Sequence, residues 1–203
     1  MISLSSNLKG RFFLHTNSFF SYIYHSIKFE FHYYNIMINK RVEEELNKQV
    51  NAEMYSAYLY LSMSAYCADN NLAGFSHWMQ LQFEEEQAHA MKFFQYILDR
   101  GGKVELKQIN QPKQEWDGII DVFDAVLKHE QHITKMINDL VNVAMEERDH
   151  ATVNLLQWYV SEQVEEEATT SDLLDQLRLI EGKGAGLFML DREAKLRSNS
   201  PVA

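Results

Sequence analysis

Cysteine, proline and long apolar runs are scarce in this chain of 203 residues. Cys67 is the one cysteine, which excludes an intramolecular disulfide, a zinc site of several thiolates and a paired Cys-x-x-Cys iron site. Such cysteine usage fits a reducing, cytoplasmic setting. Pro112 is the first of two prolines, so none interrupts the sequence before it. No run approaches the roughly 18 apolar residues that span a bilayer, so we expect no membrane insertion.

Acidic residues outnumber basic ones by 29 to 19, and the formal net charge is −10 at pH 7. The excess lies wholly outside residues 1–36, where Lys9, Arg11 and Lys28 face Glu30 alone. An acidic body repels nucleic acid and attracts metal cations. We therefore expect cations, and not nucleic acid, as partners.

Residues 1–36 differ from the rest of the chain. They are rich in Phe, Tyr, Ser and Asn, lack a consistent period, and end where Met37 opens a helical pattern. Three interpretations stay open: sequence translated from a misplaced start, a targeting peptide for an organelle, or a functional extension; the first is the simplest. A secretory signal is disfavoured because His15 and Asn17 interrupt its apolar part. We expect this segment and the tail at 198–203 to be disordered.

Apolar or small residues recur at alternating spacings of three and four along four long segments, which predicts four helices. They run from the N-cap Asn39 to about Asn70, from Asn71 to Gly101, from Asp117 to about Glu147, and from the cap Asp149 to Gly182. The apolar seam of the fourth comprises Thr152, Leu156, Tyr159, Thr170, Leu173, Leu177 and Ile180. Residues 187–197 predict a short fifth helix, which needs packing to be stable and so indicates an assembly contact.

The linker at residues 101–116 decides the topology. At roughly 3.3 Å per residue it can span about 50 Å, more than the roughly 44 Å of a helix of about 29 residues. The third helix can therefore begin at the opposite end of the bundle. Two antiparallel hairpins joined by one long crossover form an all-α four-helix bundle.

Each predicted long helix carries an acid in its apolar seam: Glu53, Glu86, Glu130 and Glu166. All four lie within about half a turn of the helix midpoints, so they should meet at one level. Buried carboxylates that converge need protons or a metal to neutralise them. His89 follows Glu86 by three residues, the Glu-x-x-His spacing of di-iron sites. Carboxylates with one imidazole suit iron or manganese.

The fourth helix lacks a second Glu-x-x-His motif. Gln163 stands where the glutamate would fall, and Glu166 where the histidine would. Glu53, Glu86 and His89 could hold one iron while Glu86 and Glu130 bridge toward the other. The second iron then has mainly Glu130, Gln163 and Glu166, a weaker all-oxygen set. Iron held loosely can leave after oxidation, which favours iron as a substrate in transit over a permanent cofactor.

Residues 37–197 resemble prokaryotic non-haem ferritins in Asn51-Ala52-Glu53-Met54-Tyr55, Glu85-Glu86-Gln87-Ala88-His89 and Leu156-Gln157-Trp158-Tyr159-Val160-Ser161-Glu162-Gln163. The resemblance implies a ferroxidase centre of Glu53, Glu86, His89, Glu130, Gln163 and Glu166. It also implies a third iron site, made of Glu85, Glu162, Glu165 and Glu166, and a redox role for Tyr60. By the same resemblance the chain binds no haem, oxidises Fe(II) with O2 or H2O2, and stores ferric mineral in a hollow shell of 24 copies.

Other functions are alternatives to iron storage. A di-iron oxidase or oxygenase acting on a small organic substrate would need an apolar pocket and a durable metal pair. A purely structural assembly would have no use for acids in its seams. Bacterioferritin is disfavoured by the missing motif, and rubrerythrin by the single cysteine. A solvated acidic face remains an alternative for the third site, as does a hydrogen-bonded core aromatic for Tyr60.

The helical pattern that begins at Met37 predicts that residues 1–36 are not needed for folding. We expect a chain that starts at Met37 to fold and assemble like the full chain, because the predicted core contains nothing upstream of that residue. Size-exclusion chromatography with light scattering of both chains measures this. Loss of assembly on truncation would show that residues 1–36 contribute to the particle.

Overall fold

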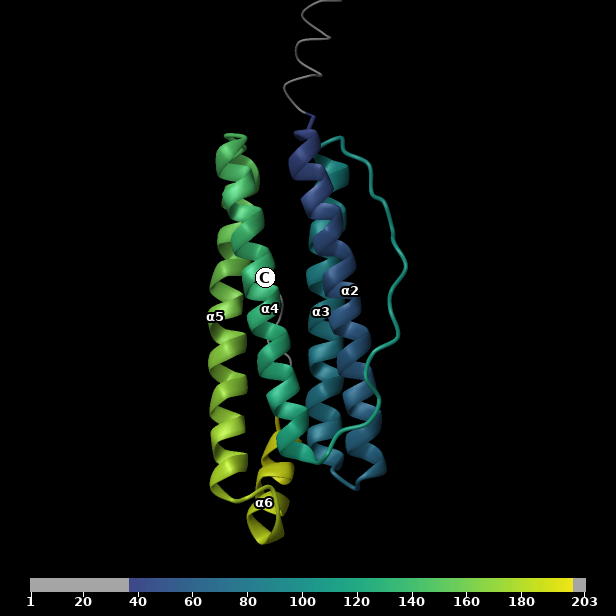
Figure 1. Cartoon of the computed structure of the whole chain (residues 1–203), viewed down its shortest axis with the longest axis vertical. Coiled ribbons are helices and arrows are strands. Elements are labelled where there is room, and N and C mark those ends of the chain that lie inside the picture. Colours follow the sequence, from purple (N-terminus) through teal and green to yellow (C-terminus); the bar gives the residue numbers. More distant parts are fainter. Residues whose placement is uncertain (1–36, 199–203) are drawn as a thin grey trace, which may run out of the picture. The chain divides into compact units, whose positions relative to one another are not determined.

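The computed structural model describes residues 37–198, so the expectations for residues 1–36 and for most of the tail lie outside the described residues. The described part holds five helices and no strand: α2 Lys40–Asp69, α3 Ala73–Asp99, α4 Ile119–Glu146, α5 His150–Leu179 and α6 Gly184–Ala194 (Figure 1). The predicted all-α bundle with a short fifth helix is confirmed. Among these described helices, none is long and apolar enough to cross a membrane.

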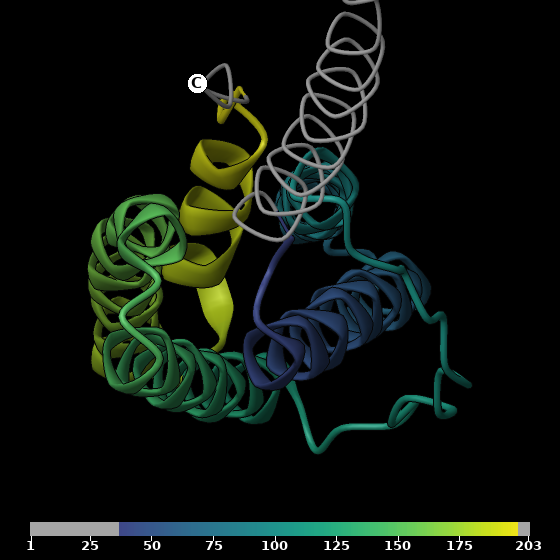
Figure 2. The same cartoon turned by 90° about the horizontal axis from the view of Figure 1, so that it is seen from above.

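The four long helices form two antiparallel hairpins, α2 with α3 and α4 with α5, which lie side by side in both views (Figures 1 and 2). The segment between Asp99 and Ile119 has no regular secondary structure and runs along the bundle beside α2 (Figure 1). It carries the chain from the end of α3 to the far end of the bundle, as the linker length predicts. Both hairpins therefore place their helix midpoints at the same height.

Side-chain caps explain where two of the helices begin. The Asn39 side chain accepts a hydrogen bond from the backbone N–H of Arg41 at 2.8 Å at the start of α2. The Asp149 carboxylate accepts one from the N–H of Thr152 at 3.1 Å at the start of α5. Arg100, which follows α3, forms an ion pair with Asp149 at 3.0 Å. This pair ties the end of one hairpin to the turn of the other.

The apolar core is divided into two clusters along the bundle. One cluster gathers around Tyr60, Phe75 and Phe123. The other gathers around Leu46 and Phe93 and includes Tyr159. Between the two clusters the helices present buried polar side chains, and these belong to the candidate site.

Two predictions about the C-terminal third of the chain were wrong in detail. Leu174, and not Leu173, is fully buried, because the seam steps four residues from Thr170 before it steps three to Leu177. The fifth helix begins at Gly184 and ends at Ala194, three residues earlier at each end than the sequence indicates.

The early start of α6 depends on close packing against the end of the preceding segment. A Cβ at Gly186 would lie 2.9 Å from Cγ2 of Ile180, so only glycine allows the first turn of α6 to approach so closely. Gly186, which looks like part of a linker in the sequence, is thus a packing contact against Ile180.

Helix α6 also supplies the cap of α3. One carboxylate oxygen of Asp191 accepts hydrogen bonds from the backbone N–H groups of Gly74 at 2.9 Å and Phe75 at 3.0 Å. These N–H groups have no partner within α3, because they lie in its first turn. The contact is tight, since a Cβ at Gly74 would lie 1.5 Å from the backbone oxygen of Asp191.

We expect Asp191→Ala to destabilise the metal-free protein by about 1 kcal/mol, the usual cost of losing a helix N-cap. Asp191→Asn should cost less, because its amide oxygen can still accept both hydrogen bonds. Thermal unfolding of the two variants and the parent protein measures the difference. Equal melting temperatures for Asp191→Ala and the parent would contradict the capping role.

Candidate metal centre

A layer of buried carboxylates crosses the bundle between the two apolar clusters. Each long helix contributes one glutamate close to its midpoint, and the four are nearly inaccessible to solvent: Glu53, Glu86, Glu130 and Glu166. His89 and Gln163 are buried at the same level. The helix lengths and the crossover therefore place these acids as the sequence pattern predicts.

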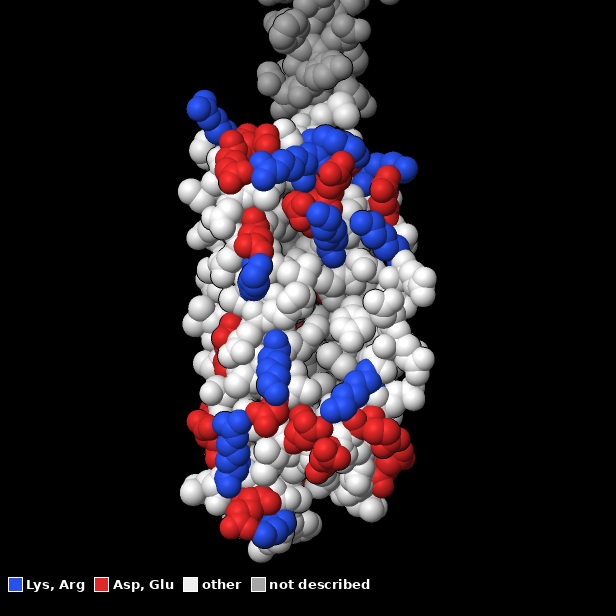
Figure 3. All heavy atoms as spheres, in the orientation of Figure 1, with Lys and Arg blue, Asp and Glu red and all other residues white. Residues whose placement is uncertain are grey.

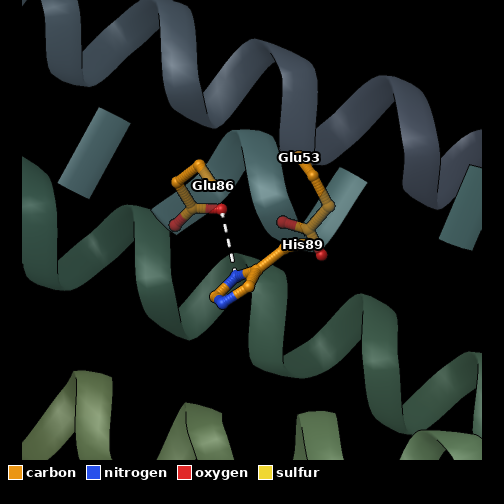
Figure 4. A group of neighbouring side chains, drawn as sticks. All are labelled: Glu53, Glu86 and His89. Atoms are coloured by element: carbon orange, nitrogen blue, oxygen red, sulfur yellow. Dashed lines mark ion pairs between the residues drawn. The ribbon is translucent and has the colours of Figure 1, made fainter. Parts of the chain in front are cut away.

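Three of the predicted residues meet closely. Glu53 on α2 and the pair Glu86 and His89 on α3 each offer one ligand atom, and these atoms lie within 4.8 Å of one another (Figure 4). Nδ1 of His89 is 3.6 Å from a carboxylate oxygen of Glu86, the interaction drawn as a dashed line. Within the described residues, this is the only His, Cys, Asp or Glu group of three or more with such spacing.

Two oxygens of this group lack a hydrogen-bond partner. Gln49 donates to Oε1 of Glu53 at 2.9 Å, but Oε2 of Glu53 and Oε2 of Glu86 accept no hydrogen bond although both are buried. Leaving a buried polar atom unpaired costs about 1–3 kcal/mol. A cation bound between these oxygens and the imidazole of His89 would satisfy both, so the donor set fits a metal ion such as iron.

The other half of the site consists of oxygens and amides held by hydrogen bonds. The Tyr60 hydroxyl donates a short hydrogen bond to Glu130. Nε2 of Gln163 donates to the second oxygen of Glu130 at 3.1 Å. Nε2 of Gln82 donates to Glu166 at 3.0 Å. This half contains no imidazole, in agreement with the asymmetry of the sequence motifs.

Burial controls the protonation of the layer. It raises the pKa of Glu53 and of Glu86 well above the ordinary value, and the charges of Glu130 and Glu166 add to the effect on Glu86. The pKa of Glu130 is raised for the same reason, although Tyr60 and Gln163 partly oppose this by hydrogen bonding. Burial raises the pKa of Glu166 to about 8. The metal-free layer thus holds protons near neutral pH, and a divalent cation would displace them.

Tyr60 lies inside the core beside the second half of the site. Its ring contacts Trp78 edge to face, with centroids 6.3 Å apart. Burial, followed by the charge of Glu130, raises the pKa of the Tyr60 hydroxyl well above its ordinary value. The group is a neutral phenol that orients Glu130, and its redox role stays a prediction.

The residues predicted for a third site lie at the edge of this layer. Glu85 is partly buried, and the negative charge of Glu162 raises its pKa in addition to burial. Glu165 lies on the exposed face of α5. Glu85 already has a cationic partner, because Nη2 of Arg197 lies 2.7 Å from one of its carboxylate oxygens. No spacing in the sequence indicates this pair, because the two residues lie 112 positions apart.

Several supporting side chains were also missed by sequence reasoning. Gln49 precedes its partner Glu53 by four residues on the same helix, a spacing that was visible in the sequence. Gln82 instead donates to Glu166 on α5, a contact that no local spacing indicates. The Tyr159 hydroxyl donates to the backbone oxygen of His89 at 2.8 Å, and the rings of Trp158 and Tyr159 flank the imidazole edge to face. These contacts fix the orientation of His89.

A bundle of two hairpins with a long crossover and a buried carboxylate and histidine layer defines the class of metal-binding four-helix proteins that handle iron. Comparison with known families narrows this class. Residues 43–180 match the family described as ferritin-like domain, and the chain belongs to the ferritin family.

Individual relatives agree with this assignment. A bacterial non-heme ferritin of Campylobacter jejuni is 43% identical over 159 residues, which cover 78% of this chain and 95% of that protein. One of Bacteroides fragilis is 39% identical over 157 residues, covering 77% and 98%. Among solved structures, an open pore ferritin of the archaeon Archaeoglobus fulgidus superimposes with a TM-score of 0.78 at 50% identity, covering 79% of this chain and 99% of that one.

The raised pKa of Glu166 predicts how stability depends on pH. Its neutral form is favoured in the folded state, so its contribution is fully present below the ordinary pKa of about 4.5 and is lost as pH rises through about 8. We expect metal-free Glu166→Gln to melt several degrees above the parent at pH 8.5, with the gap closing near pH 5. Thermal melts across this range measure it; a gap that is constant with pH would contradict the assignment.

Proposed function

We propose that Glu53, Glu86, His89, Glu130, Gln163 and Glu166 form a di-iron ferroxidase centre. As a ferritin, the chain stores iron and oxidises Fe(II) to Fe(III). The observation that supports these residues most strongly is the pair of unpartnered oxygens of Glu53 and Glu86 facing an imidazole in the middle of the core. Apolar residues at these positions would pack better in a core without a metal ion.

The two halves of the centre would hold iron unequally. The half with Glu53, Glu86 and His89 offers an imidazole and closely spaced carboxylates. The half with Glu130 and Gln163 offers oxygens alone, and both carboxylate oxygens of Glu130 already accept hydrogen bonds within the protein. Iron in the second half is therefore bound more weakly and leaves more readily once oxidised, which favours iron as a substrate in transit over a permanent cofactor.

The oxidation balances with either oxidant. Two Fe(II) ions release one electron each, and O2 takes both electrons with two protons to give H2O2. With H2O2 as the oxidant, the same two electrons and two protons give two molecules of water. The carboxylates with raised pKa release protons when Fe(II) binds, which places protons close to the reaction.

We further propose that 24 copies assemble into a hollow shell that contains the ferric mineral. Apolar side chains lie exposed on α2 and the crossover, at Tyr58, Leu61, Leu106 and Ile109, and on α6, at Phe188 and Met189. On the face drawn in Figure 3, charges of both signs gather toward the two ends of the bundle, and the band between them is largely uncharged. Such surfaces suit contacts between copies.

The cytoplasm is the compartment we infer. Cys67, the single cysteine, is buried, and burial raises the pKa of its thiol to about 12, so it stays protonated and unreactive. A chain without disulfides suits a reducing compartment. An organelle is the alternative if residues 1–36 act as a targeting peptide.

The oxidase interpretation requires a pocket for an organic substrate next to the metal pair. One cavity of about 290 Å³ opens between α4 and α5 and is lined by Thr134, Ile137, Asn138, Val160, Gln163, Val164 and Glu167. Gln163 is the one residue of the proposed centre in its wall. This contact alone does not favour a substrate other than iron.

We expect Glu86→Ala and His89→Ala to slow Fe(II) oxidation at least about 100-fold, because each removes a ligand from the half that binds iron more firmly. Stopped-flow absorbance of ferric species after aerobic Fe(II) addition measures the rate. Glu44→Ala, which removes an exposed glutamate of α2, is the matched control and should keep the parent rate. Parent-like rates in both site variants would refute the assignment of these two ligands.

A further inference from the structure

Arg197, three residues beyond the end of α6, is anchored against α3 in three ways. Nη2 donates to Oε2 of Glu85 at 2.7 Å. The guanidinium lies 4.7 Å from the centre of the Trp78 ring. The backbone oxygen of Arg197 lies 3.3 Å from Nε2 of His77. A charged side chain from the C-terminal segment is thus held at the edge of the carboxylate layer.

The surroundings of this guanidinium are acidic. Its positive charge lowers the pKa of both Glu85 and Glu166, which opposes the larger effect of their burial. Glu162 acts on Glu85 in the opposite sense. Nη1 of Arg197 is buried and has no hydrogen-bond partner, so the guanidinium is not fully satisfied where it lies. Arg197 therefore serves as a counter-charge for acids that an incoming metal ion would also use.

We propose that Arg197 is a built-in competitor for the third iron position, one that occupies Glu85 until Fe(II) displaces it. The inference rests on the proposed function, because it assumes that Glu85 belongs to an iron site. Oε2 of Glu85 cannot bind a metal ion fully while it accepts the hydrogen bond from Arg197. Two cations at one carboxylate also repel each other.

Competition of this kind has two consequences. Iron at the third position is held more weakly than at the two-iron centre, where no cationic side chain of residues 37–198 pairs with Glu53 or Glu130. Iron at the third position also breaks the ion pair between Arg197 and Glu85. Residues 195–198 therefore become more mobile as iron fills the third position. Arg197 thereby links the state of the metal sites to the chain beyond α6.

Calorimetric titration of the assembled full chain with Fe(II) under argon tests the competition. Replacing Arg197 by Gln removes the charge but keeps a polar side chain of similar reach. We expect Arg197→Gln to tighten the weakest class of Fe(II) sites about tenfold or more and to leave the tight class unchanged. Arg192→Gln is the matched control, because Arg192 is an exposed arginine of α6 that lies against Phe188. If the weakest class of sites in Arg197→Gln binds Fe(II) with unchanged or lower affinity, the proposal is overturned.

Two further measurements distinguish failure of the Arg197 proposal from failure of the proposed two-iron centre. Glu85→Gln should abolish the weakest class; if that class persists, Glu85 is not a ligand and the inference falls, while the tight class still reports on the two-iron centre. If the tight class is missing from the parent protein, the proposed function itself fails. Hydrogen exchange of the parent protein needs no variant: amides of residues 195–198 should exchange faster as the weak class fills, and unchanged exchange contradicts the proposal.

Discussion

The structure depends on one electrostatic constraint, the burial of four glutamates in a single layer of the core. Apolar clusters lie on both sides of this layer, so water cannot screen the charges. The metal-free protein meets the constraint by protonation, which the raised pKa values of Glu86 and Glu166 express. In the proposed di-iron centre, iron would meet the constraint differently, by replacing these protons with a divalent cation. Binding, oxidation and proton release are thus parts of one charge balance.

The surrounding side chains hold the acids and His89 of this layer in place by hydrogen bonds. Gln49 and Gln82 each hold one oxygen of an acid, and the Tyr159 hydroxyl holds the backbone of His89. Two buried carboxylate oxygens of the layer accept no hydrogen bond, one of Glu53 and one of Glu86, and they indicate where a cation fits. The imidazole stands on one side of the layer only. The proposal that iron passes through the centre as a substrate rests on this asymmetry.

Much of the fold was predictable because it depends on the spacing of residues that are close in the sequence. The seams depend on residues three or four apart, and the Asn39 and Asp149 caps depend on residues two or three apart. The common level of the four acids depends on helix length, and the crossover depends on the length of the linker. The start of α6 was misplaced because Gly186 indicates a linker until Ile180 is seen to pack against it. The ion pair between Arg197 and Glu85 joins positions 112 residues apart, and the periodicity of the sequence does not indicate contacts between such distant positions.

Aerobic addition of Fe(II) to the assembled protein, from about two to several hundred ions per chain, tests the central claim most directly. Ferric absorbance follows oxidation, and sizing of the product follows storage. We predict rapid oxidation of the first ions, followed by continued uptake into a soluble particle of unchanged size. Saturation at about two tightly held ions per chain would contradict this account, because the layer would then hold a permanent cofactor.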